Sequence, residues 1–94
     1  MSRLSEADAG EILHAHITSE FLYRRRGVEL TDDLDLIDSG VLDSMAILRL
    51  VNFVCERFAI TVEPNELVLD NFQTLRVLRR FVGGKLRGAR EAAG

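Results

Sequence analysis

Residues 36–58 read LIDSGVLDSMAILRLVNFVCERF, and this stretch decides our prediction of the fold. Asp43 and Ser44 are both good helix starters, because a short side-chain oxygen accepts a hydrogen bond from an unpaired N–H group of the first turn. The apolar residues behind them recur every three or four positions: Met45, Leu48, Val51, Val54, Cys55 and Phe58, with Ile47, Leu50 and Phe53 widening the stripe. We therefore predict a largely covered helix over 44–58, with Ser44 at its rim, where a partner can reach the hydroxyl.

A first helix is predicted before this stretch. Ser5 is its cap, its apolar face runs through about Tyr23, and Gly27 stops it. We interpret the three arginines at 24–26 as a solvated helix end, with a nucleic-acid or membrane contact as the alternative. Residues 28–43 show no helical or strand periodicity. Their apolar side chains can nevertheless pack a long ordered loop against a helical bundle: Val28, Leu30, Leu34, Leu36, Ile37, Val41 and Leu42.

Two further helices are predicted after residue 58. Pro64 fits the first position of a short third helix. Thr74 caps a last helix, which we expect to end at Gly83 and Gly84, leaving 84–94 as a flexible tail. The solvated side of this last helix is expected to carry Arg76, Arg79 and Arg80.

The composition suits one small globular domain over 1–94, with its core at about 6–83, because the chain is 47% hydrophobic and 29% charged. No apolar run approaches the roughly 20 residues that span a bilayer, and the first residues lack an apolar signal core, so we expect a cytoplasmic monomer. Cys55 is the only cysteine, which excludes an internal disulfide, and we expect it to be buried and inert.

The charges are unevenly distributed along the chain. Residues 28–43 contain six acids and no base, whereas residues 71–94 contain six bases and one acid. We therefore expect a negative surface around Ser44 and a positive far end.

Neither the acids of the loop nor the histidines predict a metal site. A calcium-binding EF-hand loop starting at Asp33 needs glycine at its sixth position, where Asp38 stands. His14 and His16 are two residues apart on a helix, so they lie on different faces and make a poor metal or catalytic pair.

The segment GVLDSM at 40–45, followed by a long apolar helix, resembles the attachment site of the acyl and peptidyl carrier protein family. The resemblance covers about Ile12 to Val82. Other positions that are similar to the family are Leu36, Asp38, Gly40, Phe58, Ile60, Thr61, Val62, Phe72 and Thr74. The resemblance implies an all-α fold: a small four-helix carrier bundle of three long helices and one short helix, with a long ordered loop between helices 1 and 2.

The resemblance also implies a non-catalytic phosphoprotein whose Ser44 bears a covalent 4′-phosphopantetheine arm derived from coenzyme A. In this family a phosphopantetheinyl transferase attaches the arm with a magnesium ion of its own, and the thiol of the arm holds the cargo as a thioester. No His, Lys or Cys lies close in sequence to activate Ser44, which agrees with modification by a separate enzyme. The implied later partners are adenylating acyl or amino-acid ligases and downstream thioester-using enzymes of a biosynthetic pathway.

Recognition by these partners is expected to centre on the start and outward face of the second helix: Asp43, Met45, Ala46, Ile47, Arg49 and Phe53. Phe53 and Ile47 either contact a ligase or add packing against the long loop. Fatty-acid synthase carriers have a second helix rich in Glu and Asp, whereas the outward face of this one has a lone acid, Glu56. The chain is therefore more similar to free-standing peptidyl carriers or to the D-alanyl carrier, with an amino acid or a related carboxylic acid as cargo.

Three alternatives stay open. A polyketide or fatty-acid type acyl carrier shares the fold and the prosthetic group. An unmodified helical protein-interaction module would use Ser44 only as a cap, and Ser44→Ala would then cost about 1 kcal/mol of stability and no function. A nucleic-acid binder would use the basic last helix, but a net charge of −3 and few aromatic residues argue against it.

Overall fold

The structure is a computed structural model that describes residues 4–22 and 27–93, with side chains as far as residue 88. These residues form no strand, and their long elements are α1 (Glu6–Phe21), α2 (Ser44–Phe58) and α3 (Leu75–Ala93). The predicted all-α bundle is confirmed. Tyr23 and the three arginines after it, where we expected the first helix to close, lie outside the described residues.

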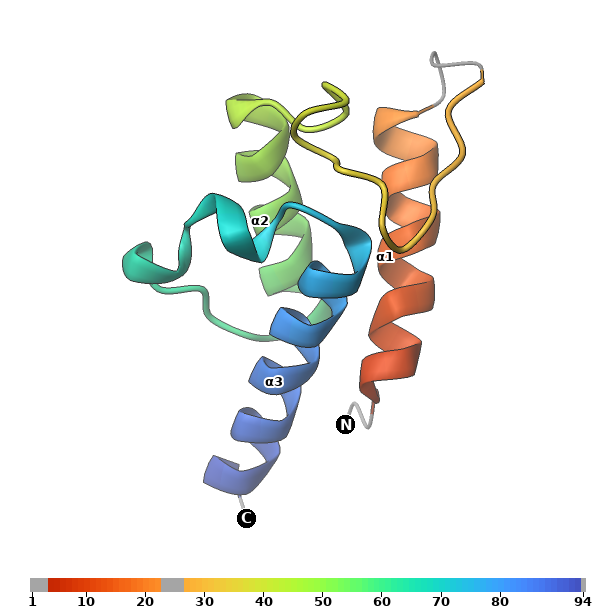
Figure 1. The fold of residues 1–94 in the computed structure, drawn as a ribbon. Coiled ribbons are helices and arrows are strands. Elements are labelled where there is room, and N and C mark those ends of the chain that lie inside the picture. Colours follow the sequence, from red (N-terminus) through yellow and green to blue (C-terminus); the bar gives the residue numbers. More distant parts are fainter. Residues whose placement is uncertain (1–3, 23–26, 94) are drawn as a thin grey trace.

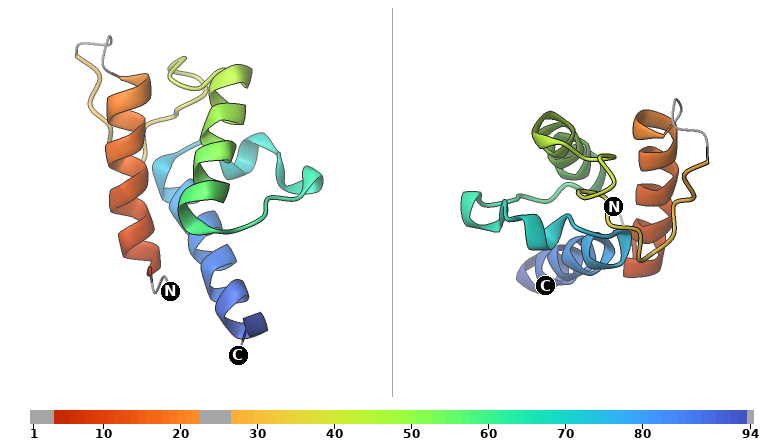
Figure 2. Two further views of the ribbon diagram at one scale, coloured as in Figure 1. Left: turned by 180° about the vertical axis from the view of Figure 1, so that it is seen from behind. Right: turned by 45° about the horizontal axis from the view of Figure 1, so that its top comes forward.

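The helices form a small bundle in which α1 runs against both α2 and α3 (Figure 1). The loop after α1 passes alongside that helix and then reaches the start of α2, which lies near the end of α1. Seen from behind, the segment between α2 and α3 lies on the side of these two helices that faces away from α1 (Figure 2). The start of α2 is therefore at one end of the bundle, opposite the end of α3.

One apolar core joins the helices to the long loop. The largest fully buried side chains on the helices are Leu13, Ile17, Leu50, Val54, Leu78 and Val82. The loop contributes Leu36, Val41 and Leu42, which are exposed by 0%, 5% and 2%. The prediction that apolar side chains pack the loop against the bundle is confirmed.

The buried face of α2 differs from the stripe that the sequence suggested. Its buried residues are Ala46, Leu50, Val54 and Phe58. Met45 and Leu48 are exposed by 67% and 52%, so their assignment to a covered stripe was wrong. The helix is apolar around most of its circumference, and the bundle covers only one side of it. Cys55 is a free thiol that is partly rather than fully buried.

The last helix continues through Gly83 and Gly84 to Ala93, so its predicted end at these glycines was wrong, and residues 84–93 are helical. A Cβ atom at position 83 would lie 2.7 Å from Cγ and 2.8 Å from Cβ of Glu6. Gly83 is therefore a point of close approach between α1 and α3 rather than a helix stop. Leu86, farther along α3, is 7% exposed and ties the extension to the core.

The predicted short third helix consists of two separate 3-10 turns, η1 (Pro64–Glu66) and η2 (Leu69–Asn71). Pro64 does open the first turn, as expected. The apolar residues between the two turns, together with the first residue of η2, lie on the surface: Leu67, Val68 and Leu69 are exposed by 43%, 45% and 58%. Without a buried stripe, this segment has little tertiary packing to stabilise a longer α-helix.

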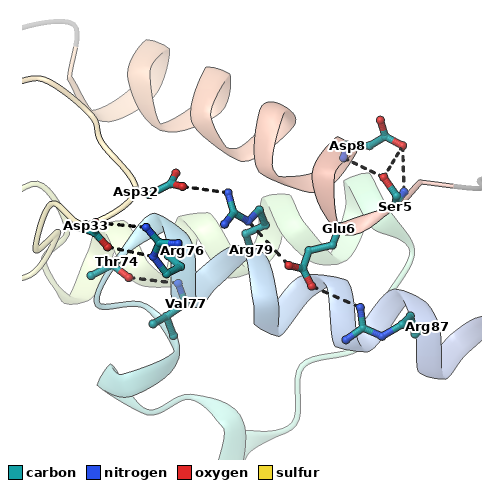
Figure 3. Close-up of polar contacts among 10 residues, drawn as sticks. All are labelled: Ser5, Glu6, Asp8, Asp32, Asp33, Thr74, Arg76, Val77, Arg79 and Arg87. Carbon is teal, nitrogen blue, oxygen red and sulfur yellow. Dashed lines mark hydrogen bonds and ion pairs between the residues drawn. The ribbon is translucent and has the colours of Figure 1, made fainter.

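Ion pairs join α3 to α1 and to the long loop (Figure 3). Arg79 lies 3.2 Å from Asp32 and 3.9 Å from Glu6, and Arg76 lies 3.0 Å from Asp33. The hydrogen bond from Arg76 holds the pKa of Asp33 below its ordinary value. Arg80 is exposed, as predicted, and the Arg76 side chain is 41% exposed. The prediction missed that Arg76 and Arg79 are paired with acids of the loop and of α1.

Two further bases of α3 are also matched by acids of the same chain. Lys85 Nζ lies 2.6 Å from Glu66 Oε1, and Arg87 Nη1 lies 3.4 Å from Glu6 Oε1. These pairs reduce the positive surface that we expected at this end of the molecule. They also weaken the case for nucleic-acid binding, because a base that is paired within the chain has less charge to offer a phosphate.

Gly83→Ala and Gly84→Ala provide a matched test of the contact between α1 and α3. An added Cβ at position 84 meets no atom closer than Arg87 Nη2 at 3.9 Å. Gly84→Ala should therefore raise the free energy of unfolding by about 0.5–1 kcal/mol, because alanine favours the helix. Gly83→Ala should lower it by about 1–3 kcal/mol, because Glu6 must be displaced. Urea denaturation measures both changes, and equal stabilisation by the two variants would contradict the close approach.

Candidate functional site at the start of helix α2

Ser44 is the first residue of α2 and its side chain is exposed. The residue before it, Asp43, is the N-cap, and its carboxylate accepts a hydrogen bond from the N–H of Ala46 at 2.8 Å. The carbonyl of Asp43 also accepts from the N–H of Ile47 at 2.9 Å. The predicted helix start at Ser44 is confirmed, and the capping bond is made by Asp43. The hydroxyl of Ser44 is therefore not needed to cap the helix.

The chain approaches Ser44 through an anchored turn. Gly40 has φ 80°, a left-handed conformation that other residues adopt at a cost. The N–H of Leu42 then donates to the carbonyl of Leu36 at 2.8 Å. Because the Leu36 and Leu42 side chains are buried, the segment that precedes Ser44 is fixed to the core on both sides of the turn.

The N-terminal turn of α2 provides a favourable place for an anion. The first N–H groups of a helix have no partner within it, and they form the positive end of the helix dipole. Among the described residues, no hydrogen-bond acceptor is found for the N–H groups of Ser44 and Met45. Asp38 and Asp43 are exposed, whereas the loop acids Asp32 and Asp33 are paired with arginines of α3. The negative surface around Ser44 stays a prediction.

Two exposed apolar side chains adjoin Ser44. Met45 is the next residue, and Leu48 lies four positions later, which places it one helical turn from Ser44 on the same side. We predicted that Leu48 belongs to the covered stripe, and so did not expect it at the surface. Its spacing from Ser44 is the signal that could have placed it beside the site.

The predicted recognition residues do not form one outward face. Asp43, Met45 and Arg49 are exposed, whereas Ile47 and Phe53 are half-buried. Ala46 is 7% exposed and packs in the core, so its inclusion among the recognition residues was wrong.

Phe53 and Arg49 instead contact α1. The Phe53 ring stacks on the ring of His16, with a centroid distance of 3.5 Å and an interplanar angle of 8°. Arg49 lies 3.9 Å from Glu20 and 5.7 Å above the ring centroid of Phe21. Phe53 is therefore a packing residue between α1 and α2, and we now expect Phe53→Ser to reduce stability rather than to affect only partner binding.

The surface hollows of the molecule do not include Ser44. Two open surface hollows of about 540 and 380 Å³ lie elsewhere, one between α1 and α3 and one beside the second half of α3, and neither is lined by Ser44. Over residues 4–22 and 27–93, no group of three or more His, Cys, Asp or Glu side chains could hold a metal ion. In the same part of the chain, no helix is long and apolar enough to cross a membrane.

A family model described as the phosphopantetheine attachment site matches residues 16–82, which is most of the chain. The chain belongs to the phosphopantetheine-attachment family. No curated protein matches the sequence. Carriers of this family hold a covalently attached 4′-phosphopantetheine, and they are generally non-catalytic. The matched part of this carrier includes the long loop, all of α2 and the first half of α3, and therefore both Ser44 and the elements that hold it in place.

Asp43→Ala and Ser44→Ala test which of the two residues caps α2 in this carrier. Asp43→Ala should lower the free energy of unfolding by about 1 kcal/mol, because it removes the bond to the Ala46 N–H. Ser44→Ala should change it by less than about 0.5 kcal/mol, because alanine is well tolerated within a helix. Chemical denaturation of both variants tests this. A larger loss for Ser44→Ala than for Asp43→Ala would show that Ser44 is the cap after all.

The stacked pair of His16 and Phe53 predicts acid sensitivity in this carrier. Burial lowers the pKa of His16 below its ordinary value, and Arg49 lowers it further, while Glu20 opposes both. The unfolded chain therefore binds a proton more readily, so the free energy of unfolding is greatest above about pH 6.5 and falls as the pH drops below that value. His16→Phe keeps an aromatic ring but cannot titrate. Denaturation between pH 7 and pH 5 should show a smaller decline for this variant, and equal declines would contradict the prediction.

Proposed function

We propose that Ser44 is the attachment residue for 4′-phosphopantetheine and that this carrier holds an amino acid or a related carboxylic acid as a thioester. One observation supports the choice of Ser44 most strongly. Within a chain of this family, Ser44 stands exposed at the first position of α2 while another residue, Asp43, caps the helix.

The residues around Ser44 fit the group. A helix start suits a phosphate, because its free N–H groups and the helix dipole favour negative charge. Met45 and Leu48 offer exposed apolar surface to the aliphatic part of an arm. When bound, the arm supplies a terminal thiol that holds the cargo as a thioester. The chain itself presents the Ser44 hydroxyl from a rigid helix start.

Activation of the Ser44 hydroxyl is assigned to a separate phosphopantetheinyl transferase. A serine is a weak nucleophile unless a base accepts its proton. Within the described residues, the two histidines are engaged elsewhere, His14 at the carbonyl of Leu30 and His16 on Phe53. Neither histidine of the chain is therefore placed to act as a base for Ser44, and we assign this role to the transferase, which uses coenzyme A as the donor of the arm.

The proposed cargo rests on the outward surface of α2. Met45 and Leu48 are its most exposed apolar side chains, and Arg49 lies against Glu20 of α1. Glu56 is the acid on this surface. A partner that binds here would rely on apolar contacts rather than on a basic patch, which favours an amino-acid-adenylating ligase over enzymes that recognise strongly acidic carriers.

Loading of the modified protein tests this assignment. The carrier is first converted with coenzyme A and a transferase, and is then offered to amino-acid-adenylating ligases and to an acyl-activating ligase, each with ATP and its own substrate. We expect thioester formation with an amino acid, detected as a mass increase that hydroxylamine removes. Exclusive loading by the acyl-activating ligase would instead assign the protein to the polyketide or fatty-acid type. Peptide fragmentation should place the arm on Ser44.

A further inference from the structure

The side chains of Asp35 and Gln73 join the long loop to the segment just before α3. Gln73 Nε2 donates a hydrogen bond to Asp35 Oδ2 at 2.8 Å, and both residues are half-buried. The other carboxylate oxygen, Oδ1, accepts from the N–H of Ile37 at 3.0 Å and from the N–H of Asp38 at 2.8 Å. The carboxylate of Asp35 therefore stabilises the turn of the loop through Oδ1 and links that turn to Gln73 through Oδ2.

Backbone hydrogen bonds continue from this pair toward Ser44. The carbonyl of Gln73 accepts from the N–H of Leu36 at 2.7 Å, and the carbonyl of Leu36 accepts from the N–H of Leu42 at 2.8 Å. Leu42 is bonded directly to Asp43, which caps α2. An unbroken series of contacts therefore runs from Gln73 through Leu36 to the residue that precedes Ser44.

The charge state of Asp35 determines which way the amide of Gln73 points. Hydrogen bonds from the Asp38 N–H and then from the Gln73 side chain lower the pKa of Asp35, with desolvation acting in the opposite direction. The carboxylate is ionised at neutral pH and can only accept hydrogen bonds. Gln73 must therefore present its NH₂ group, and a residue without a donor cannot replace it.

We propose that Asp35 and Gln73 are positioning residues for the modification of Ser44: their bond holds Leu36, and through Leu42 it fixes the start of α2 in the orientation that the transferase requires. This inference rests on the proposed attachment at Ser44. The hydrogen bonds of the two side chains lead to each other and to the loop backbone rather than to Ser44, so both residues act through the loop. Correct orientation of a nucleophile accelerates the chemical step itself, so loss of the bond should reduce kcat more than it raises KM.

Three variants isolate this bond from the rest of the loop. Gln73→Glu removes the donor and sets two carboxylates against each other. Asp35→Asn together with Gln73→Glu reverses the polarity: the new amide can donate to the new carboxylate, while its oxygen still accepts from the Ile37 and Asp38 N–H groups. Asp35→Asn alone is a control, because the Gln73 amide can turn to present its oxygen to the new NH₂ group.

The experiment measures the rate of transfer from coenzyme A by intact mass, at a temperature where circular dichroism shows every variant to be folded. Hydrogen exchange at the Leu36 and Leu42 amides is recorded in parallel. We expect Gln73→Glu to lower kcat by about tenfold and to speed exchange at both amides. The double variant and Asp35→Asn should return both readouts to within about twofold of the wild type. Gln73→Met, which removes the donor without adding charge, serves if Gln73→Glu does not fold.

A normal kcat in Gln73→Glu despite faster exchange would overturn the positioning role, as would a low kcat that the double variant fails to restore. Loss of thermal stability without a change in kcat would mark the bond as purely structural. If transferases leave the folded wild type unmodified as well, the proposed function fails and the positioning role with it. That outcome is distinct from a loss confined to Gln73→Glu.

Discussion

Leu36→Ala is expected to lower the free energy of unfolding by about 2–5 kcal/mol. The Leu36 side chain is 0% exposed. The backbone N–H of Leu36 donates a hydrogen bond to the carbonyl of Gln73, and its carbonyl accepts one from the N–H of Leu42. The truncation would leave a cavity where the long loop meets the core. A small domain has only about 5–15 kcal/mol of stability in total, so this single change should bring the protein close to unfolding.

Ile37→Ala is the matched control, because Ile37 is the next residue along the loop and is only partly buried. Urea denaturation should give a clearly smaller loss for this variant, and the dependence of the free energy on urea should be similar for both if the unfolded state is unchanged. If the two substitutions cost the same, the loop is not an integral part of the core. A loss below about 1 kcal/mol for Leu36→Ala would lead to the same conclusion.

The elements that local chemistry determines could be predicted from the sequence. Ser5 and Asp43 have short oxygen-bearing side chains at helix starts, and both caps are present in the structure. Pro64 likewise opens a helical turn. The location of Ser44 at the start of α2 follows from such signals, because a cap and the apolar helix behind it lie within a few residues of each other.

Features that depend on distant parts of the chain could not be predicted in this way. The apolar residues of α2 cover most of its surface, so only the packed bundle shows that Leu50 faces inward and Leu48 outward. Gly83 has the local signature of a helix end, yet it lies inside α3, where Glu6 of α1 occupies the space that a side chain would fill.

The long-range polar contacts show the same limit. Asp35 and Gln73 are 38 positions apart, and Asp33 and Arg76 are 43 apart. Single-sequence patterns show an acidic loop and a basic helix but not which charges meet. We therefore interpreted the two regions as separate surfaces, whereas the fold brings them together.

Ser44→Ala is expected to abolish attachment of the arm completely, because the variant lacks the oxygen that would form the phosphoester bond. The loss should occur in a folded protein, since Asp43 rather than Ser44 caps α2. Ser39→Ala is a useful control, because Ser39 lies in the loop that leads to the same helix. Circular dichroism of each variant confirms that the helices are intact before the comparison is made.

The decisive measurement is the intact mass of the wild type, Ser44→Ala and Ser39→Ala after incubation with coenzyme A and a broad-specificity phosphopantetheinyl transferase. We predict that the wild type and Ser39→Ala each gain one phosphopantetheinyl group and that Ser44→Ala gains none. A gain of the same group by Ser44→Ala, or no gain by a folded wild type with several transferases, would contradict attachment at Ser44.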